Sequence, residues 1–186
     1  MARAARALDR GQGFGRCVWW AWAAFAAGLA AGLVFGIMEP PAGTRFQMPE
    51  GPDLLPLLRH NFTVAACLVA GGALLGIPSL IGVSLNGALV GLFTGRLLAV
   101  EGGWKLMAAG VLPHGVLELP AYVLFGAVGA GLGLHVSALL GMDVAQPRGR
   151  VMLAGTMMAA AMLLISGLIE SYVTPGVVAK VLSTLS

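Results

Sequence analysis

Three ionisable residues stand inside otherwise apolar stretches, and their types and spacing could support chemistry. His114 and Glu118 are four residues apart, so they would share one face of a helix. Glu170 lies in a separate apolar stretch near the C-terminus. A charged side chain at the centre of a bilayer costs about 2.5–3.5 kcal/mol on insertion scales, so residues of this kind are candidates for a functional site.

Two asparagines complete the expected polar cluster. Asn61 heads one apolar stretch, and Asn86 lies within the next. In the topology predicted below, Asn61, Glu170 and the His114–Glu118 pair fall near the outer ends of their spans, so we expect them to meet in the outer leaflet. Asn86 is the deepest member of this intramembrane cluster, and we expect its amide to bond the broken backbone near Pro78.

Three interpretations of the cluster remain open. In the structural one, His114, Glu118 and Glu170 bond one another and the irregular backbone around Pro113. In the second, they line a water-exposed cavity for protons, ions or a small ligand. In the third, the same three residues bind a metal, because a histidine with two carboxylates suits zinc or iron. The spacing is HxxxE rather than the HExxH of zinc peptidases, and the sequence itself requires no cofactor.

The composition decides the class of protein. Of the 186 residues, 58% are hydrophobic and 10% are charged, whereas soluble domains have about 45–50% and 25%. Soluble enzymes and disordered chains are therefore excluded, and we predict an all-α, polytopic transmembrane bundle. The net charge of +3 comes from scattered basic residues, so no nucleic acid partner is expected. The chain carries no GxSxG, Walker or dinucleotide-binding motif, so we expect no enzyme activity.

The apolar runs predict about five spans in a single membrane domain covering residues 1–186. A straight helix over residues 62–99 would be about 57 Å long, against a hydrocarbon core of about 30 Å. This run must therefore fold back, and Ile77-Pro78-Ser79 is the expected break. A proline-rich outer loop is expected at 38–60, and the rival topology bends residues 104–142 into a re-entrant pair between Gly126 and Gly133. The predicted spans are 17–37, 62–77, 80–99, 113–140 and 151–173.

The first run sets the expected orientation. It is longer than the roughly 7–15 apolar residues of a signal peptide core, so we interpret it as a retained span rather than a cleaved signal. Four arginines precede it and place the N-terminus in the cytoplasm, in a multi-pass protein of the inner (cytoplasmic) membrane. They are Arg3, Arg6, Arg10 and Arg16.

Small residues recur every four positions in two of the predicted spans. Such spacing forms a groove on one helix face, into which another helix can pack. Two interpretations follow: packing within one bundle, or self-association into a homo-oligomer, for which the first three of these glycines are the candidates. The glycines are Gly28, Gly32, Gly36, Gly87, Gly91 and Gly95.

Two motifs carry a resemblance to a known family. The runs VLPHGVLELPA at 111–121 and SGLIESYVTP at 166–175, with Asn61 and Asn86-Gly87, resemble the stage II sporulation protein M family over residues 10–180. The resemblance implies a multi-span protein that anchors a cell-wall-remodelling complex and works with peptidoglycan hydrolases. It also makes His114, Glu118 and Glu170 signature positions.

From these observations we predict a non-enzymatic scaffold in the lipid bilayer. It would recruit other membrane or cell-envelope proteins through the outer loop or its lateral helix faces. The alternative is a transporter or channel-like protein whose pathway is lined by the His/Glu cluster, binding protons or a metal.

Overall fold

The computed structural model describes residues 2–39 and 52–184, and within these ranges the only regular elements are helices. Five of the helices are long and apolar enough to cross a membrane. The predicted all-α polytopic membrane fold is therefore confirmed. In chain order the elements are α1 (Ala2–Met38), α2 (Leu54–Ala70), the 3-10 turn η1 (Gly71–Leu74), α3 (Ile77–Leu98), α4 (Gly103–Leu139), α5 (Gly149–Tyr172) and α6 (Thr174–Leu182).

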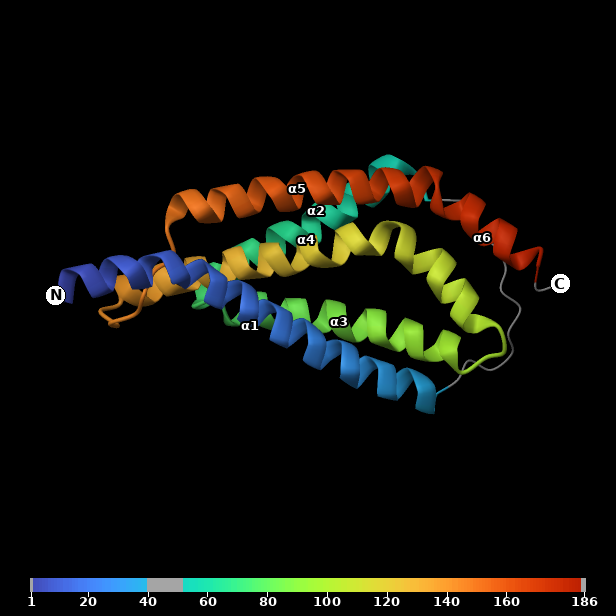
Figure 1. The fold of residues 1–186 in the computed structure, drawn as a ribbon, viewed down its shortest axis with the longest axis horizontal. Helices are drawn as coiled ribbons and strands as arrows, with labels where there is room; N and C mark the ends of the chain where they lie inside the picture. The colour runs from blue at the N-terminus through green and yellow to red at the C-terminus, as the bar shows by residue number, and fades with distance from the viewer. Residues whose placement is uncertain (1, 40–51, 185–186) are drawn as a thin grey trace.

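The helices form an elongated bundle with α4 at its centre. Helices α1 and α3 lie side by side as one pair, and α4 runs between this pair and α5 (Figure 1). Helix α2 packs against both α4 and α5. In the apolar stretch of α4 that could cross a membrane, 61% is buried inside the bundle, against 22–33% for the corresponding stretches of the other four long helices. Side chains on α4 are therefore the ones that the bundle encloses.

One end of the bundle gathers the elements that matter for the site. Here α1, α3 and α5 end, α2 and α4 begin, and the short helix α6 leads to the C-terminus (Figure 1). We call this the α6 end. The N-terminus lies at the opposite end of the bundle (Figure 1).

The four-residue spacing of small residues is explained by the α1–α3 pair. A Cβ added to Gly28 would overlap the Ser84 carbonyl oxygen, and one added to Gly32 would overlap that of Ala88. The reciprocal glycines Gly87, Gly91 and Gly95 of α3 meet backbone atoms of α1 in the same way. The interpretation as packing within the bundle is confirmed. Self-association through the face of Gly28, Gly32 and Gly36 is wrong, because α3 already covers it.

The chain folds back earlier than proline placement suggested. Leu75 and Gly76 adopt left-handed conformations, with φ of 59° and 76°. They reverse the chain after η1, so the second span ends before residue 77 and Ile77 begins α3. Pro78 lies in the first turn of α3, where its missing N–H has no helical partner to lose. The break expected at Ile77-Pro78-Ser79 is thus corrected to Leu75–Gly76.

Two other boundaries differ from expectation. Helix α2 begins at Leu54, inside the expected outer loop 38–60, because Pro56 falls in its first turn and is tolerated there. Residues 40–51 of that loop lie outside the described residues. Helix α4 continues through Pro113 and Pro120 as one bent helix instead of starting at residue 113 (Figure 1). It remains helical from Gly126 to Gly133, so the re-entrant pair is wrong.

The reversal at Gly76 provides a test of the packing at this turn. Gly76 and Gly141 both have positive φ, but only a Cβ on Gly76 meets a neighbour, lying 2.8 Å from the Ala130 Cα. Gly141→Ala should lower the free energy of unfolding by about 1–2 kcal/mol through backbone strain. Gly76→Ala should lower it by about 1–3 kcal/mol more through overpacking. Thermal unfolding in detergent measures both, and equal losses would contradict this packing.

Candidate functional site

The three ionisable residues of the apolar stretches meet at the α6 end. His114 and Glu118 share one face of α4, and the His114 Nε2 lies 3.8 Å from the Glu118 Oε2. Glu170 reaches the same place from α5. The ligand atoms that the three side chains offer all lie within 4.8 Å of one another. The structure therefore brings together the histidine and the two carboxylates that the sequence singled out.

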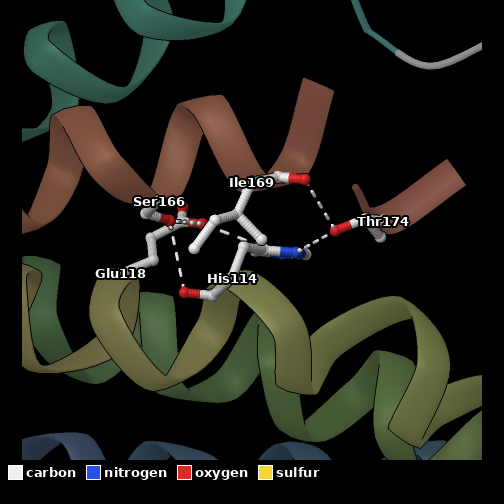
Figure 2. Close-up of polar contacts among 5 residues, drawn as sticks. All are labelled: His114, Glu118, Ser166, Ile169 and Thr174. Atoms are coloured by element: carbon white, nitrogen blue, oxygen red, sulfur yellow. Dashed lines mark hydrogen bonds and ion pairs between the residues drawn. The ribbon is translucent and has the colours of Figure 1, made fainter. Parts of the chain in front are cut away.

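Hydroxyl groups from α5 and α6 hold these side chains in place. The fully buried Ser166 hydroxyl lies 3.4 Å from the Glu118 Oε2 and 3.3 Å from the His114 carbonyl oxygen, and either oxygen can accept its single hydrogen (Figure 2). The Thr174 hydroxyl donates to the Ile169 carbonyl oxygen at 3.3 Å, and it also lies 3.3 Å from the His114 Nδ1 (Figure 2). Both elements that follow α4 in sequence thus contribute to the site.

The Thr174 contacts bear on the protons of the His114 ring. The Thr174 hydroxyl has one hydrogen, and it lies 3.3 Å from both the Ile169 carbonyl oxygen and the His114 Nδ1. In the tautomer in which that hydrogen goes to Ile169, the Nδ1 donates to Thr174, and the Nε2, which faces Glu118, carries a lone pair.

The site is mostly enclosed. The side chains of His114 and Glu118 are 15% and 16% exposed. The buried Tyr122, one turn beyond Glu118, has its hydroxyl close to the Glu118 carboxylate. His60 of α2 and Glu170 are near enough to act on Glu118 electrostatically. The enclosure thus concentrates two carboxylates and an imidazole in one small volume.

The two asparagines have different positions. Asn61 is 2% exposed, and its Nδ2 finds no partner among the described residues. Asn86 donates to the Gly82 carbonyl oxygen one turn back on α3, at 3.0 Å. The prediction that Asn86 belongs to the cluster is therefore corrected, and so is the bond expected near Pro78. A carbonyl oxygen of its own helix accepts the hydrogen bond from the Asn86 amide.

Three residues of the site were not among the sequence candidates, namely Tyr122, Ser166 and Thr174. A signal for them exists in the spacing. Tyr122 follows Glu118 by four residues, while Ser166 and Thr174 flank Glu170 at four residues on either side. Two matching ladders, 114–118–122 and 166–170–174, therefore face each other across α4 and the α5–α6 segment.

The Ser166 hydroxyl should contribute measurably to stability. Ser166→Ala removes the donor to Glu118, and interhelical hydrogen bonds in membrane proteins are worth about 0.6–1.7 kcal/mol. We expect a loss of that size in the free energy of unfolding in detergent. Thr156→Val is the matched control on α5, because its hydroxyl bonds only a carbonyl of its own helix. Equal effects of the two substitutions would contradict the inter-helix role of Ser166.

Comparison with known proteins relates the sequence to a family and to an archaeal protein. The sequence model of the stage II sporulation protein M family matches residues 21–175. An uncharacterised protein of Methanocaldococcus jannaschii is 25% identical over 131 residues, which cover 68% of this chain and 74% of that protein. No solved structure matches the chain. All six residues of the two ladders fall within the region that the family model covers.

Proposed function

The chain belongs to the stage II sporulation protein M family, and on this premise we propose that it is a non-enzymatic membrane scaffold for cell-envelope proteins. The family match is the observation that carries the proposal. The sporulation protein that gives the family its name anchors peptidoglycan hydrolases, so the partners we expect are proteins of cell-wall remodelling.

The outward face of α3 offers a surface suited to such partners. Large apolar side chains recur on it every four residues, each between 54% and 66% exposed. Such a ridge can pack into the groove of another membrane helix. The ridge residues are Ile77, Ile81, Leu85, Leu89 and Phe93.

Site-specific photo-crosslinking tests the scaffold. A benzophenone amino acid at Leu85 or Leu89, in native membranes, should give a discrete adduct with one membrane or envelope protein. The same probe at Met157, which is 66% exposed on α5, controls for random encounters. Adducts with lipid alone from all three positions would contradict the proposal.

The proposal places the protein in the cytoplasmic membrane with its N-terminus inside. The N-terminal arginines support this orientation. The α6 end, with the His/Glu cluster, would then face outwards. Alkaline phosphatase fused after Ser186 should be active, and a fluorescent protein fused there should stay dark; the opposite pattern would reverse the orientation.

A transporter or channel-like function is the second candidate, and the His114–Glu118–Glu170 cluster favours it. Ionisable groups inside membrane proteins often mark ion pathways. Reconstitution in liposomes separates this function from the scaffold. Cation flux that Glu118→Gln abolishes and His135→Gln preserves would support transport, whereas the absence of flux would leave the scaffold as the better account.

A further inference from the structure

We propose that His114, Glu118 and Glu170 bind one divalent transition-metal cation, for which Zn²⁺ is a suitable probe. The site would link α4 to α5 at the α6 end. In a scaffold, the bound ion would stabilise the contact between α4 and α5. In a transporter, it would occupy an ion-binding position. The inference therefore does not depend on which of the two proposed functions holds.

The convergence of three ligand groups on one point carries this inference. In the tautomer whose Nδ1–H is donated to Thr174, the His114 Nε2 presents a lone pair towards the Glu118 Oε2. Their separation of 3.8 Å is too long for a direct hydrogen bond. Glu170 offers an oxygen within 4.8 Å of a ligand atom of each of the other two side chains. An imidazole lone pair and two carboxylates, which accept hydrogen bonds when ionised, thus surround one point, and a cation there would satisfy all three.

The dimensions suit a small divalent ion. A tetrahedral ion with ligands at about 2.1 Å holds neighbouring ligand atoms about 3.4 Å apart. The observed separations are 3.8 Å for one pair and at most 4.8 Å for the others, so the ligand atoms must close by about 0.4 Å in the first pair and by up to about 1.4 Å in the others. One nitrogen and two oxygens form a ligand set that suits Zn²⁺ or Fe²⁺ and leaves a fourth position open.

The surrounding groups resemble those that support metal ligands. A metal-binding histidine donates its other N–H to a fixed acceptor, and ligating carboxylates are themselves hydrogen-bonded. The Thr174 hydroxyl, 3.3 Å from the His114 Nδ1, is placed for the first role, and the Ser166 hydroxyl, 3.4 Å from the Glu118 Oε2, is placed for the second. A cation would also compensate two carboxylates at membrane depth, which would otherwise be costly.

Zinc titration of the full-length protein tests the proposal. The protein is purified in detergent, stripped with a chelator, desalted and titrated with ZnCl₂ by calorimetry. We expect one Zn²⁺ per chain. Glu118→Gln and Glu170→Gln should each weaken binding at least 100-fold, and Thr174→Val by about 10–100-fold through loss of ring orientation. His135→Gln is the matched control, because His135 lies on the same helix and bonds its own Gly131 carbonyl.

The proposal is overturned if the wild-type protein takes up no Zn²⁺, or if the carboxylate variants bind as tightly as the wild type. Size-exclusion chromatography establishes whether each variant is folded. If the glutamine variants do not fold, Thr174→Val decides, because it keeps all three ligands. Weaker binding at unchanged stoichiometry supports the site, and unchanged affinity contradicts it. Crosslinking, which tests the scaffold, and cation flux, which tests the transporter, are measured in separate experiments. Either functional proposal can therefore fail while the zinc-binding result stands, and the zinc-binding proposal can fail while either of them stands.

Discussion

Gly32→Leu is expected to prevent the protein from folding into a stable bundle. Even a Cβ at this position would overlap the Ala88 carbonyl oxygen of α3, and backbone cannot move aside as a flexible side chain can. Overpacking a core commonly costs about 1–3 kcal/mol and occasionally more. Because this clash is with backbone in the middle of the α1–α3 pair, we expect a loss above about 3 kcal/mol. Size-exclusion chromatography and thermal unfolding in detergent measure it.

Gly15→Leu on the same helix is the matched control. A Cβ at Gly15 would meet nothing within 4 Å, and leucine favours a helix over glycine by roughly 0.5–1 kcal/mol. This control should therefore be neutral or slightly stabilised. A stable Gly32→Leu variant would contradict the α1–α3 packing. A folded variant that had lost only an oligomeric form would return the Gly28–Gly32–Gly36 face to an intermolecular role.

The membrane fold could be predicted from the sequence because length and apolarity decide it almost alone. The turn between the second and third spans could not be predicted, because the sequence pattern favours a break at Pro78. Pro78 is compatible with the first turn of a helix, and the reversal depends instead on positive φ at Leu75 and Gly76. Nothing about a leucine in the sequence indicates a left-handed conformation. The turn η1 that precedes it packs against α4, a contact that only the folded bundle supplies.

The site could be predicted in part. The four-residue spacing of His114 and Glu118 predicted that they share one helix face. The similar predicted depth of Glu170 in the membrane predicted that it lies near them, and the structure brings the three together. Asn86 was misplaced because the depth argument does not account for an amide bonding its own helix. The hydrogen position on the His114 ring depends on Thr174, which belongs to the unpredicted helix α6. Only the assembled structure shows which imidazole nitrogen faces the Glu118 carboxylate.

Glu170→Lys is expected to stabilise the metal-free protein and to abolish its response to zinc. When both carboxylates are ionised, two like charges within 4.8 Å of each other repel by at least about 3.5 kcal/mol at an effective dielectric constant of about 20. A lysine at position 170 would attract the Glu118 carboxylate instead of repelling it, and the substitution also removes one of the metal ligands. After desolvation of the ammonium group, we expect a net gain of about 1–3 kcal/mol in the free energy of unfolding. This corresponds to about 2–4 °C in Tm for each kcal/mol.

Thermal unfolding with a chelator and with ZnCl₂ measures both effects. Glu101→Lys is the control, because it makes the same change of charge at an exposed position between α3 and α4. It should leave the metal-free Tm nearly unchanged and keep the rise with zinc. If Glu170→Lys instead unfolds at a lower temperature than the wild type without metal, Glu118 and Glu170 stabilise each other directly. The cluster would then be a structural hydrogen-bonded contact between α4 and α5 rather than a cation site.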